Sequence, residues 1–231
     1  IYSDITERKK AEQEIATARD AAEAALERQT ATADILKVIA SSPTDVQPVL
    51  DAVARAAVRF CGTTDAIVQL RDGDEYVVVA HEGPLRGTPG LRRRIKDNPA
   101  FSAMLIEGKT IYYPDIAALD PAELGGLKQI AAQVGFRAVV GTPLLREGTP
   151  IGAINLRRTE AGAFTPEQIE LLETFAAQSV IAIENVRLFT ELRSSLDQQT
   201  ATADILKVIA SSPTDVQPVL DAVVKAAVRF C

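Results

Sequence analysis

The sequence predicts an α+β domain in which helices alternate with two β-hairpins and a long helix flanks the domain on each side. Apolar residues recur at helical spacing over 46–60 and change to strand spacing over 65–82 and 136–158. Asp72-Gly73 and Glu147-Gly148 supply a turn dipeptide inside each strand region. Residues 6–41 and 167–211 contain no glycine or proline, which favours uninterrupted helices.

Length and composition limit the classes of function. The chain of 231 residues is long enough for one domain of about 150 residues plus connecting helices. Its net charge of −6 and its pI near 5.0 argue against nucleic acid or an anionic membrane surface as the partner. No apolar run approaches the ~18 residues of a membrane span, so we expect no membrane insertion.

A repeated stretch indicates how the chain is organised. Residues 29–61 and 199–231 are identical except at Ala54/Val224 and Arg55/Lys225. The second copy ends where the first continues into new sequence, so we expect a second unit that is cut off as it begins. Cys61 and Cys231 occupy the same position in the two copies, which is neither a disulfide framework nor a metal-binding set and fits a reducing cytoplasm.

The N-terminal helix is expected over 7–41. It carries a narrow stripe of small and apolar residues with alternating spacings of three and four, as in coiled coils: Ala22, Leu26, Ala33 and Leu36. A stripe this thin buries little against its own domain, so the pattern predicts pairing with a second copy. A helix folded back on its own core is the alternative.

The first half of the domain follows in order. Pro43 ends the long helix, and Thr44 or Asp45 caps an amphipathic helix over 46–60. Residues 66–72 and 75–83 then form the first hairpin, with Asp72-Gly73 as a type I′ turn.

The middle of the chain is irregular. We expect a loop over 83–90, a helix over 98–106 that begins at Pro99, and a brief strand over 109–113. A helix over 120–134 is weakened by Gly125 and Gly126. Arg92, Arg93 and Arg94 form a solvated loop or hold an anionic ligand.

The second hairpin, centred on Glu147-Gly148, leads to the last helix. Thr165-Pro166-Glu167-Gln168 supplies an N-cap, a proline at the first helical position and a capping box. A helix from there to Ser211 would be about 70 Å long, more than this domain can cover. Its stripe continues through Phe189, Leu192, Leu196 and Leu206, which predicts a parallel homodimer with this helix as the interface.

Residues 140–189, VVGTPLLREGTPIGAINLRRTEAGAFTPEQIELLETFAAQSVIAIENVRLF, resemble the closing signature of the GAF domain. The resemblance covers Pro43 to Phe189, and we place the domain at 42–189. It implies a PAS-related α+β fold, an antiparallel sheet with helices on both faces, in which the outer helices pair between protomers.

Tyr2-Ser3-Asp4-Ile5-Thr6-Glu7-Arg8-Lys9 resembles the tail of a PAS domain as it opens a signalling helix. The two resemblances together imply a PAS tail at 1–6, signalling helices at 7–41 and 190–211, and the first helix of a second GAF domain at 212–231. They further imply a cytoplasmic two-component sensor histidine kinase as the parent protein, with the kinase beyond Cys231. A nucleotide cyclase is the alternative output.

The residues offer little for catalysis, and we expect no enzyme activity in this fragment and no metal site. The single histidine, His81, ends a strand before Gly83 and is expected to be a hydrogen-bonded structural residue rather than a phosphoacceptor. Gly108-Lys109-Thr110 lacks the upstream glycine of a phosphate loop. Cys61 is expected to be a small buried apolar residue.

Binding is the remaining class. By resemblance, a GAF ligand pocket lies between the sheet and the middle helices, near these candidates: Phe101, Tyr112, Tyr113, Asp115, Phe136 and His81. Core packing explains the same aromatic residues equally well. The motifs of the cyclic-nucleotide and bilin-binding GAF domains are absent, so we expect no cofactor, and an unidentified small molecule is the candidate ligand. A ligand-free dimerising spacer is the alternative, and a methionine sulfoxide reductase would need more cysteines.

Overall fold

The computed structural model of the protein describes residues 44–211, apart from the side chains of 121–123 and 209–211, and scattered positions within 9–37 and 217–224. The expected PAS tail and Leu36 lie outside the described residues. Every described position between 9 and 37 is helical, as expected for that segment. The chain divides into two units, Ile1–Ile183 and Glu184–Cys231, which are described separately.

The centre of the first unit is a six-stranded antiparallel sheet with the order β3-β2-β1-β6-β5-β4. Its strands are β1 (Asp65–Asp72), β2 (Glu75–Glu82), β3 (Arg92–Arg94), β4 (Ile111–Tyr113), β5 (Ala138–Arg146) and β6 (Thr149–Arg158). The hairpins β1–β2 and β5–β6 are the two that the sequence predicted. They meet through β1 and β6, where Asp65 is opposite Arg157.

The two hairpin turns differ in a way that their dipeptides did not indicate. Glu147 and Gly148 both have positive φ, at 49° and 79°, as a type I′ turn requires. In the β1–β2 hairpin Asp72 pairs with Glu75, so the central turn residues are Gly73 and Asp74. Gly73 alone has positive φ there, so the predicted type I′ turn at Asp72-Gly73 is wrong.

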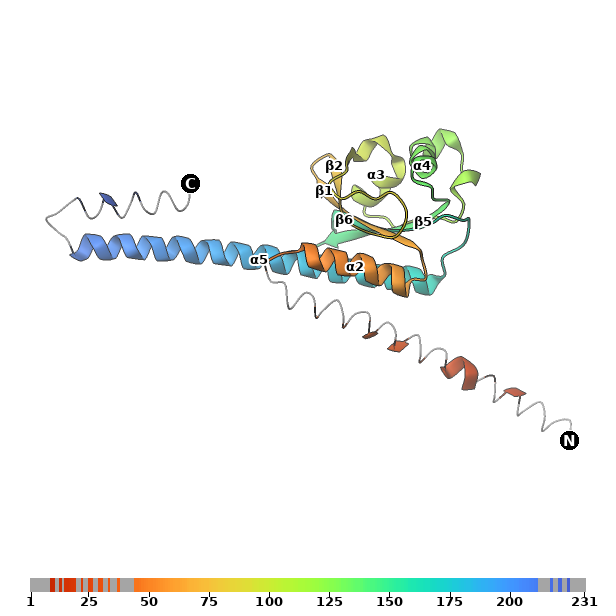
Figure 1. Cartoon of the computed structure of the whole chain (residues 1–231), viewed down its shortest axis with the longest axis horizontal. Coiled ribbons are helices and arrows are strands. Elements are labelled where there is room, and N and C mark those ends of the chain that lie inside the picture. The colour runs from red at the N-terminus through yellow and green to blue at the C-terminus, as the bar shows by residue number, and fades with distance from the viewer. Residues whose placement is uncertain are drawn as a thin grey trace. The chain divides into compact units, whose positions relative to one another are not determined.

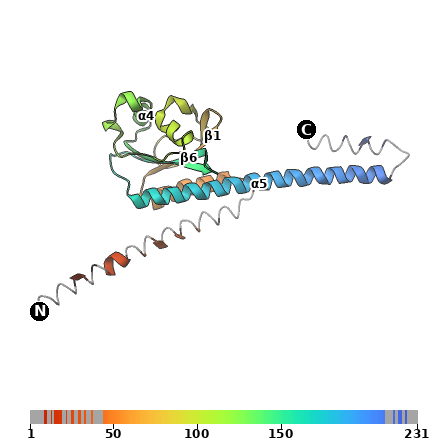
Figure 2. The same ribbon diagram turned by 180° about the vertical axis from the view of Figure 1, so that it is seen from behind.

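Helices cover both faces of the sheet, as expected. The helix α2 (Gln47–Phe60) and the first part of α5 (Pro166–Ser211) lie side by side on one face (Figure 1, Figure 2). Large apolar side chains of this layer, including Leu50, Leu172 and Phe175, are fully buried against the sheet. Burial of each such side chain stabilises the fold by about 1.5–3 kcal/mol, so α5 is firmly attached where it begins.

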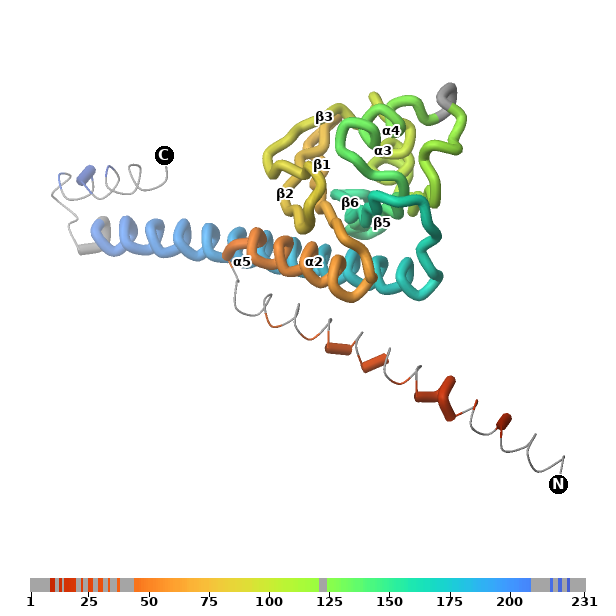
Figure 3. The backbone as a smooth tube through the Cα atoms, turned by 45° about the vertical axis from the view of Figure 1, so that its right-hand side comes forward, coloured from red at the N-terminus to blue at the C-terminus, as the bar shows by residue number. Residues whose placement is uncertain are grey.

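The other face carries the middle helices α3 (Pro99–Leu105) and α4 (Pro121–Val134), as Figure 3 shows. Two short 3-10 helices, η1 (Ile95–Asp97) and η2 (Ile116–Ala118), connect them to the strands. Their apolar side chains form a second core with that face of the sheet. The kink of α4 falls at Leu124, next to the glycines that were expected to weaken it.

Two local expectations need correction. Arg92–Arg94 is not a loop but the edge strand β3, paired with β2 from Glu75 to Val77. The N-cap position of α2 is Val46, which has no side-chain acceptor, whereas Asp45 accepts a hydrogen bond from the Gln47 amide at 2.9 Å. Asp45 therefore satisfies the first free amide from just outside the helix.

The second unit contains the C-terminal part of α5. Arg187 forms ion pairs there with Glu184 and Glu191, one turn before and after it. The apolar side chains of Phe189, Leu192, Leu196 and Leu206 are exposed within the chain. No helix within the described part of the chain is both long and apolar enough to cross a membrane.

Candidate functional site

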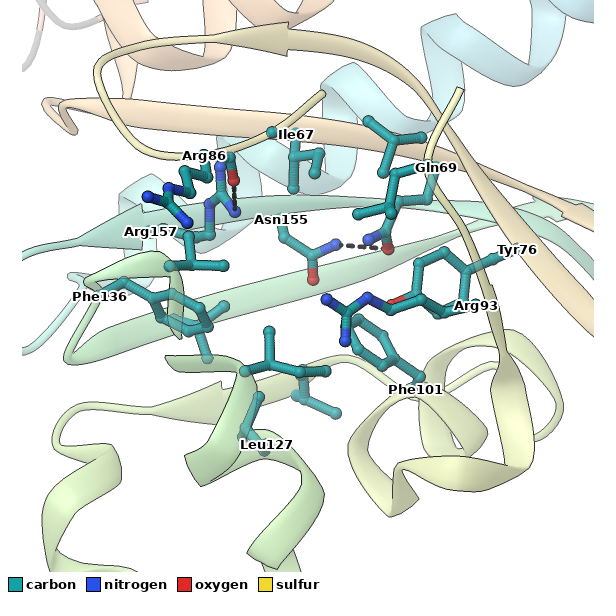
Figure 4. Close-up of a pocket in the computed structure, with 17 residues that line it drawn as sticks. Ile67, Gln69, Tyr76, Arg86, Arg93, Phe101, Leu127, Phe136, Asn155 and Arg157 are labelled. Atoms are coloured by element: carbon teal, nitrogen blue, oxygen red, sulfur yellow. Dashed lines mark hydrogen bonds between the residues drawn. The ribbon is translucent and has the colours of Figure 1, made fainter. Parts of the chain in front are cut away.

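A cavity lies between the sheet and the layer of α3 and α4 (Figure 4). It holds about 540 Å³ of empty space, a figure that includes the open solvent at its mouth. Strands β1, β2 and β6, the loop between β2 and β3, and helix α4 all contribute to the wall. The lining residues are Ile67, Gln69, Tyr76, Val78, Arg86, Gly87, Leu91, Arg93, Phe101, Ile111, Leu127, Ile130, Val134, Phe136, Val139, Asn155 and Arg157.

Most of this wall is apolar. Tyr76 and Phe101 pack with their ring centroids 4.7 Å apart on one side, and Phe136 lies on the opposite side (Figure 4). Burial raises the pKa of the Tyr76 phenol to about 12, while the charge of Arg93 acts in the opposite direction. Tyr76 is therefore a neutral residue near pH 7.

Two amide side chains form the polar part of the wall. Asn155 Nδ2 donates to Gln69 Oε1 at 3.1 Å, and both residues are almost completely buried. Asn155 Oδ1 accepts no hydrogen bond. A buried acceptor without a donor is costly, so this oxygen favours a ligand that brings a hydrogen-bond donor.

Gly141 makes room for Asn155. A Cβ atom at residue 141 would lie closer than 3.0 Å to Asn155 Oδ1 and to the sulfur of Met104. Any other residue would displace one of these side chains. The position of Asn155 in the cavity thus depends on the absence of a side chain on β5.

A buried ion pair supports the cavity from the sheet side. Asp65 is completely buried, and its Oδ1 accepts from Arg157 Nε at 2.6 Å. Arg157 Nη2 also contacts this oxygen as an ion pair but makes no hydrogen bond. Burial lowers the pKa of Arg157, and the Asp65 carboxylate opposes that shift.

The second oxygen of Asp65 holds the loop that borders the cavity. Asp65 Oδ2 lies 2.9 Å from His81 Nε2 and accepts from the Leu85 amide at 3.0 Å. Arg157 Nη1 donates to the Arg86 carbonyl oxygen at 3.2 Å. Asp65 and Arg157 together fix the backbone of residues 85 and 86 at the edge of the cavity.

The six predicted pocket residues are not gathered at one place. Phe101 and Phe136 line the cavity. His81 does not line it but supports the loop through Asp65, in agreement with the predicted hydrogen-bonded, strand-end role. Whether any of them contacts a ligand stays a prediction.

Tyr112, Tyr113 and Asp115 lie away from the cavity. The Tyr112 hydroxyl accepts from the Phe164 amide at 3.1 Å, next to the start of α5. Tyr113 is half-buried against the second core, and burial raises its pKa. Asp115 caps η2 and pairs with Arg137, which lowers the pKa of the Asp115 carboxyl.

Several residues of this site were missed from the sequence, namely Asp65, Gln69, Asn155 and Arg157, whereas Arg93 was considered only within the run of three arginines. A sequence signal existed for some of them. Gln69 and Asn155 interrupt otherwise apolar strands. Asp65 is the first residue of β1, and Arg157 is the last but one of β6. A polar residue inside an apolar strand is buried with a partner or faces a site.

Metal and thiol chemistry have no support in the described residues. No group of three or more His, Cys, Asp or Glu side chains comes together within the described part of the chain. Burial raises the pKa of the Cys61 thiol to about 12, which keeps it protonated and unreactive near neutral pH.

A family model described as GAF domain matches residues 43–184. The transcription regulator NorR of the anaerobic nitric oxide reductase, from Aeromonas hydrophila subsp. hydrophila, is 28% identical over 140 residues. Those residues are 59% of this chain and 27% of that regulator, so the chain spans about a quarter of its length.

Solved structures show the same fold. The phycoerythrobilin-bound GAF domain of a cyanobacterial phytochrome aligns with a TM-score of 0.61 and 17% identity, over 71% of this chain and 98% of that one. The free methionine-R-sulfoxide reductase of Neisseria meningitidis, in complex with its substrate, aligns with a TM-score of 0.58 and 24% identity, over 72% of this chain and 93% of that one. Since the family model covers more than half of its residues, the chain belongs to the GAF domain family.

Proposed function

We propose that this chain is a sensory module that binds a small molecule in the cavity and passes the change to α5. The carrying observation is a mostly apolar cavity whose wall includes the buried, unpartnered oxygen of Asn155. A domain that served only as a spacer would gain stability from filling this space and pairing this oxygen. NorR is named as a transcription regulator, which supports a regulatory role for this chain.

The start of α5 is tied to the sheet that forms the cavity. Arg158, the last residue of β6, donates to the Ala163 carbonyl at 2.8 Å and to Gln168 Oε1 at 3.3 Å. Gln168 in turn donates to the Cys61 carbonyl at 2.7 Å. A shift of β6 caused by a ligand would therefore move the first turn of α5.

We further propose that α5 pairs with a second copy in a cytoplasmic homodimer, where a small change in helix position becomes a signal. Support for this pairing comes from four exposed apolar side chains on α5, those of Phe189, Leu192, Leu196 and Leu206. The stripe of small and apolar residues expected on the N-terminal helix supports it as well. The parent protein would be a sensor histidine kinase with neighbouring PAS and GAF modules. A cyclase output and a ligand-free spacer are the rival hypotheses.

Ligand binding is tested by a thermal-shift screen of small molecules on the full chain. A ligand that binds the folded state raises Tm, because it stabilises that state by RT ln(1 + [L]/Kd). Ile130→Trp fills the mouth of the cavity from the half-buried side of α4 and should abolish the shift. A shift of equal size in this variant would place the ligand elsewhere and contradict the proposed site.

Dimerisation is tested by the mass in solution. Leu192→Glu combined with Leu196→Glu should yield a monomer at concentrations where the unchanged chain is a dimer. Arg193→Glu combined with Ser194→Glu introduces the same acidic side chains at adjacent positions and should leave the dimer intact. A monomeric unchanged chain at high micromolar concentration would contradict the pairing.

A further inference from the structure

The charges on the cavity wall are unbalanced. Three arginines line the cavity, namely Arg86, Arg93 and Arg157, and no aspartate or glutamate does. Arg157 is neutralised by Asp65 behind the wall. Arg86 and Arg93 have no ion pair with any described residue. An uncompensated positive charge beside an apolar cavity attracts an anion, because the low dielectric strengthens the interaction.

Arg93 is placed to use this charge. It is opposite Tyr76 in the β2–β3 ladder, so both side chains stand on the same face of the sheet. Arg93 is half-buried, and Figure 4 shows its guanidinium group directed toward Asn155 across the cavity. Neighbouring Arg92 differs, because it is exposed and paired with Asp72 and Glu75.

Arg93 also stands at the boundary with a second, more polar cavity. This outer groove holds about 830 Å³, counting its open side, and shares Tyr76, Arg93, Phe101 and Ile130 with the inner cavity. Asn98 in its wall is almost completely buried, and its Nδ2 donates no hydrogen bond. Two carboxylates, Glu75 and Asp97, and two further arginines, Arg92 and Arg94, also line the groove, and Arg92 is paired with Glu75. Of these arginines only Arg93 also lines the inner cavity, so the anion is favoured at Arg93 rather than throughout the groove.

We propose that the ligand is an amphipathic anion, with its apolar body in the inner cavity and its carboxylate or phosphate group on Arg93 at the junction with the groove. This rests on the proposed function of the cavity. Arg93 supplies paired N–H donors that suit such oxygens. Asn98 Nδ2 is an available second donor for the same group.

The test is a titration of the full chain with octanoate, octyl phosphate, octanamide and 1-octanol, which each contain eight carbons in a linear chain and differ in the head group. Calorimetry gives the four affinities for the unchanged chain and for the variants Arg93→Gln and Arg92→Gln. At least one anion should bind at least tenfold more tightly than both neutral probes. This preference should fall below twofold in Arg93→Gln and persist in Arg92→Gln, the matched arginine on the same strand.

The outcomes separate this inference from the proposed function. Equal binding of neutral and anionic probes, abolished by Ile130→Trp, would overturn the anion preference and leave the cavity as a ligand site. If none of the four probes binds, both the anion preference and the proposed binding of such amphipathic molecules in the cavity would be overturned. Retention of the anion preference in Arg93→Gln would overturn the role of Arg93. Should Arg93→Gln lose its fold, Arg93→Lys is the second variant, because it keeps the charge and should retain the anion preference. Loss of the anion preference in Arg93→Lys, with 1-octanol still bound, would contradict the inference.

Discussion

Arg157 and Arg158 are adjacent on β6 and act on opposite faces of the sheet. Arg157 pairs with the buried Asp65 and lines the cavity. Arg158 lies over the Phe164 ring, with its guanidinium carbon 4.1 Å from the ring centroid, and donates to Gln168 on α5. Strand alternation sends neighbouring side chains to opposite faces. A single peptide unit, the one between Arg157 and Arg158, therefore connects the cavity wall with the start of α5.

Replacing Asp65 should strongly destabilise the fold. Asp65→Asn leaves Arg157 buried without its counter-charge, and we expect a loss of about 3–5 kcal/mol in the free energy of unfolding. Urea denaturation measures this loss. Asp72→Asn is the control, because Asp72 is exposed and its ion pair with Arg92 contributes little in water.

Two results would decide this prediction. Equal losses for Asp65→Asn and Asp72→Asn would contradict the structural role of the buried pair. The double variant Asp65→Asn with Arg157→Met should be more stable than Asp65→Asn alone, because it removes the uncompensated charge.

Gly141→Ala should destabilise the fold and disturb the cavity. The added methyl group would lie closer than 3.0 Å to Asn155 Oδ1 and to the Met104 sulfur, so these side chains must shift. We expect a loss of about 1–3 kcal/mol, as for other overpacked sites. Gly125→Ala is the control, since nothing lies within 4 Å of its new methyl group. Equal stability of the two variants would refute the close packing of Asn155.

Gln168 should be important for the attachment of α5. Its side chain accepts from the Thr165 amide at 2.9 Å and donates to the Cys61 carbonyl at 2.7 Å. Gln168→Ala removes both bonds and also the bond donated by Arg158, and it should lower the free energy of unfolding by about 1–3 kcal/mol in urea denaturation. Gln133→Ala on the exposed side of α4 should change stability by less than about 0.5 kcal/mol. If Gln168→Ala lowers the free energy of unfolding as little as Gln133→Ala does, the role of Gln168 in attaching α5 would be contradicted.

Stability should fall as the pH rises above 9. The pKa values of Cys61 and Tyr76 are raised to about 12 by burial, from ordinary values of 9.0 and 10.0. Between those limits the unfolded chain loses protons that the folded chain retains, so each group lowers the free energy of unfolding by about 1.4 kcal/mol per pH unit. Denaturation between pH 8 and 11 measures the slope.

The control for this slope compares a protein that keeps Cys61 with the variant Cys61→Ala. Both proteins also carry Cys231→Ser, because Cys231 lies outside the described residues. The variant should lose less stability per pH unit above pH 9 than the protein with Cys61. Identical slopes would show that the Cys61 thiol is not protected by burial.

The sequence predicted those parts of the fold that depend on local signals. The capping box of Thr165 and Gln168 was expected, and both of its hydrogen bonds are present, at 2.9 and 3.3 Å. The Glu147-Gly148 turn likewise follows from its own two residues. The edge strand β3 was missed because its three arginines lack the apolar alternation of a half-buried strand.

The site was harder to predict, because it joins residues far apart in the chain. Asp65 and Arg157 meet only through the pairing of β1 with β6, which neither hairpin reveals by itself. Tyr112 and Tyr113 were assigned to one pocket, although neighbours in a strand face opposite sides. That alternation was the available signal, and it places Tyr112 beside Phe164 at the start of α5.

The central claim is that occupation of the cavity reaches α5. Hydrogen exchange of the full chain, with and without saturating octanoate, tests this claim most directly. We expect slower exchange in the loop 83–91, in β6, and in residues 159–172, which contain the first turns of α5. Slower exchange around the cavity with no change in 159–172 would contradict the connection through Arg157 and Arg158, and no change anywhere would contradict binding itself.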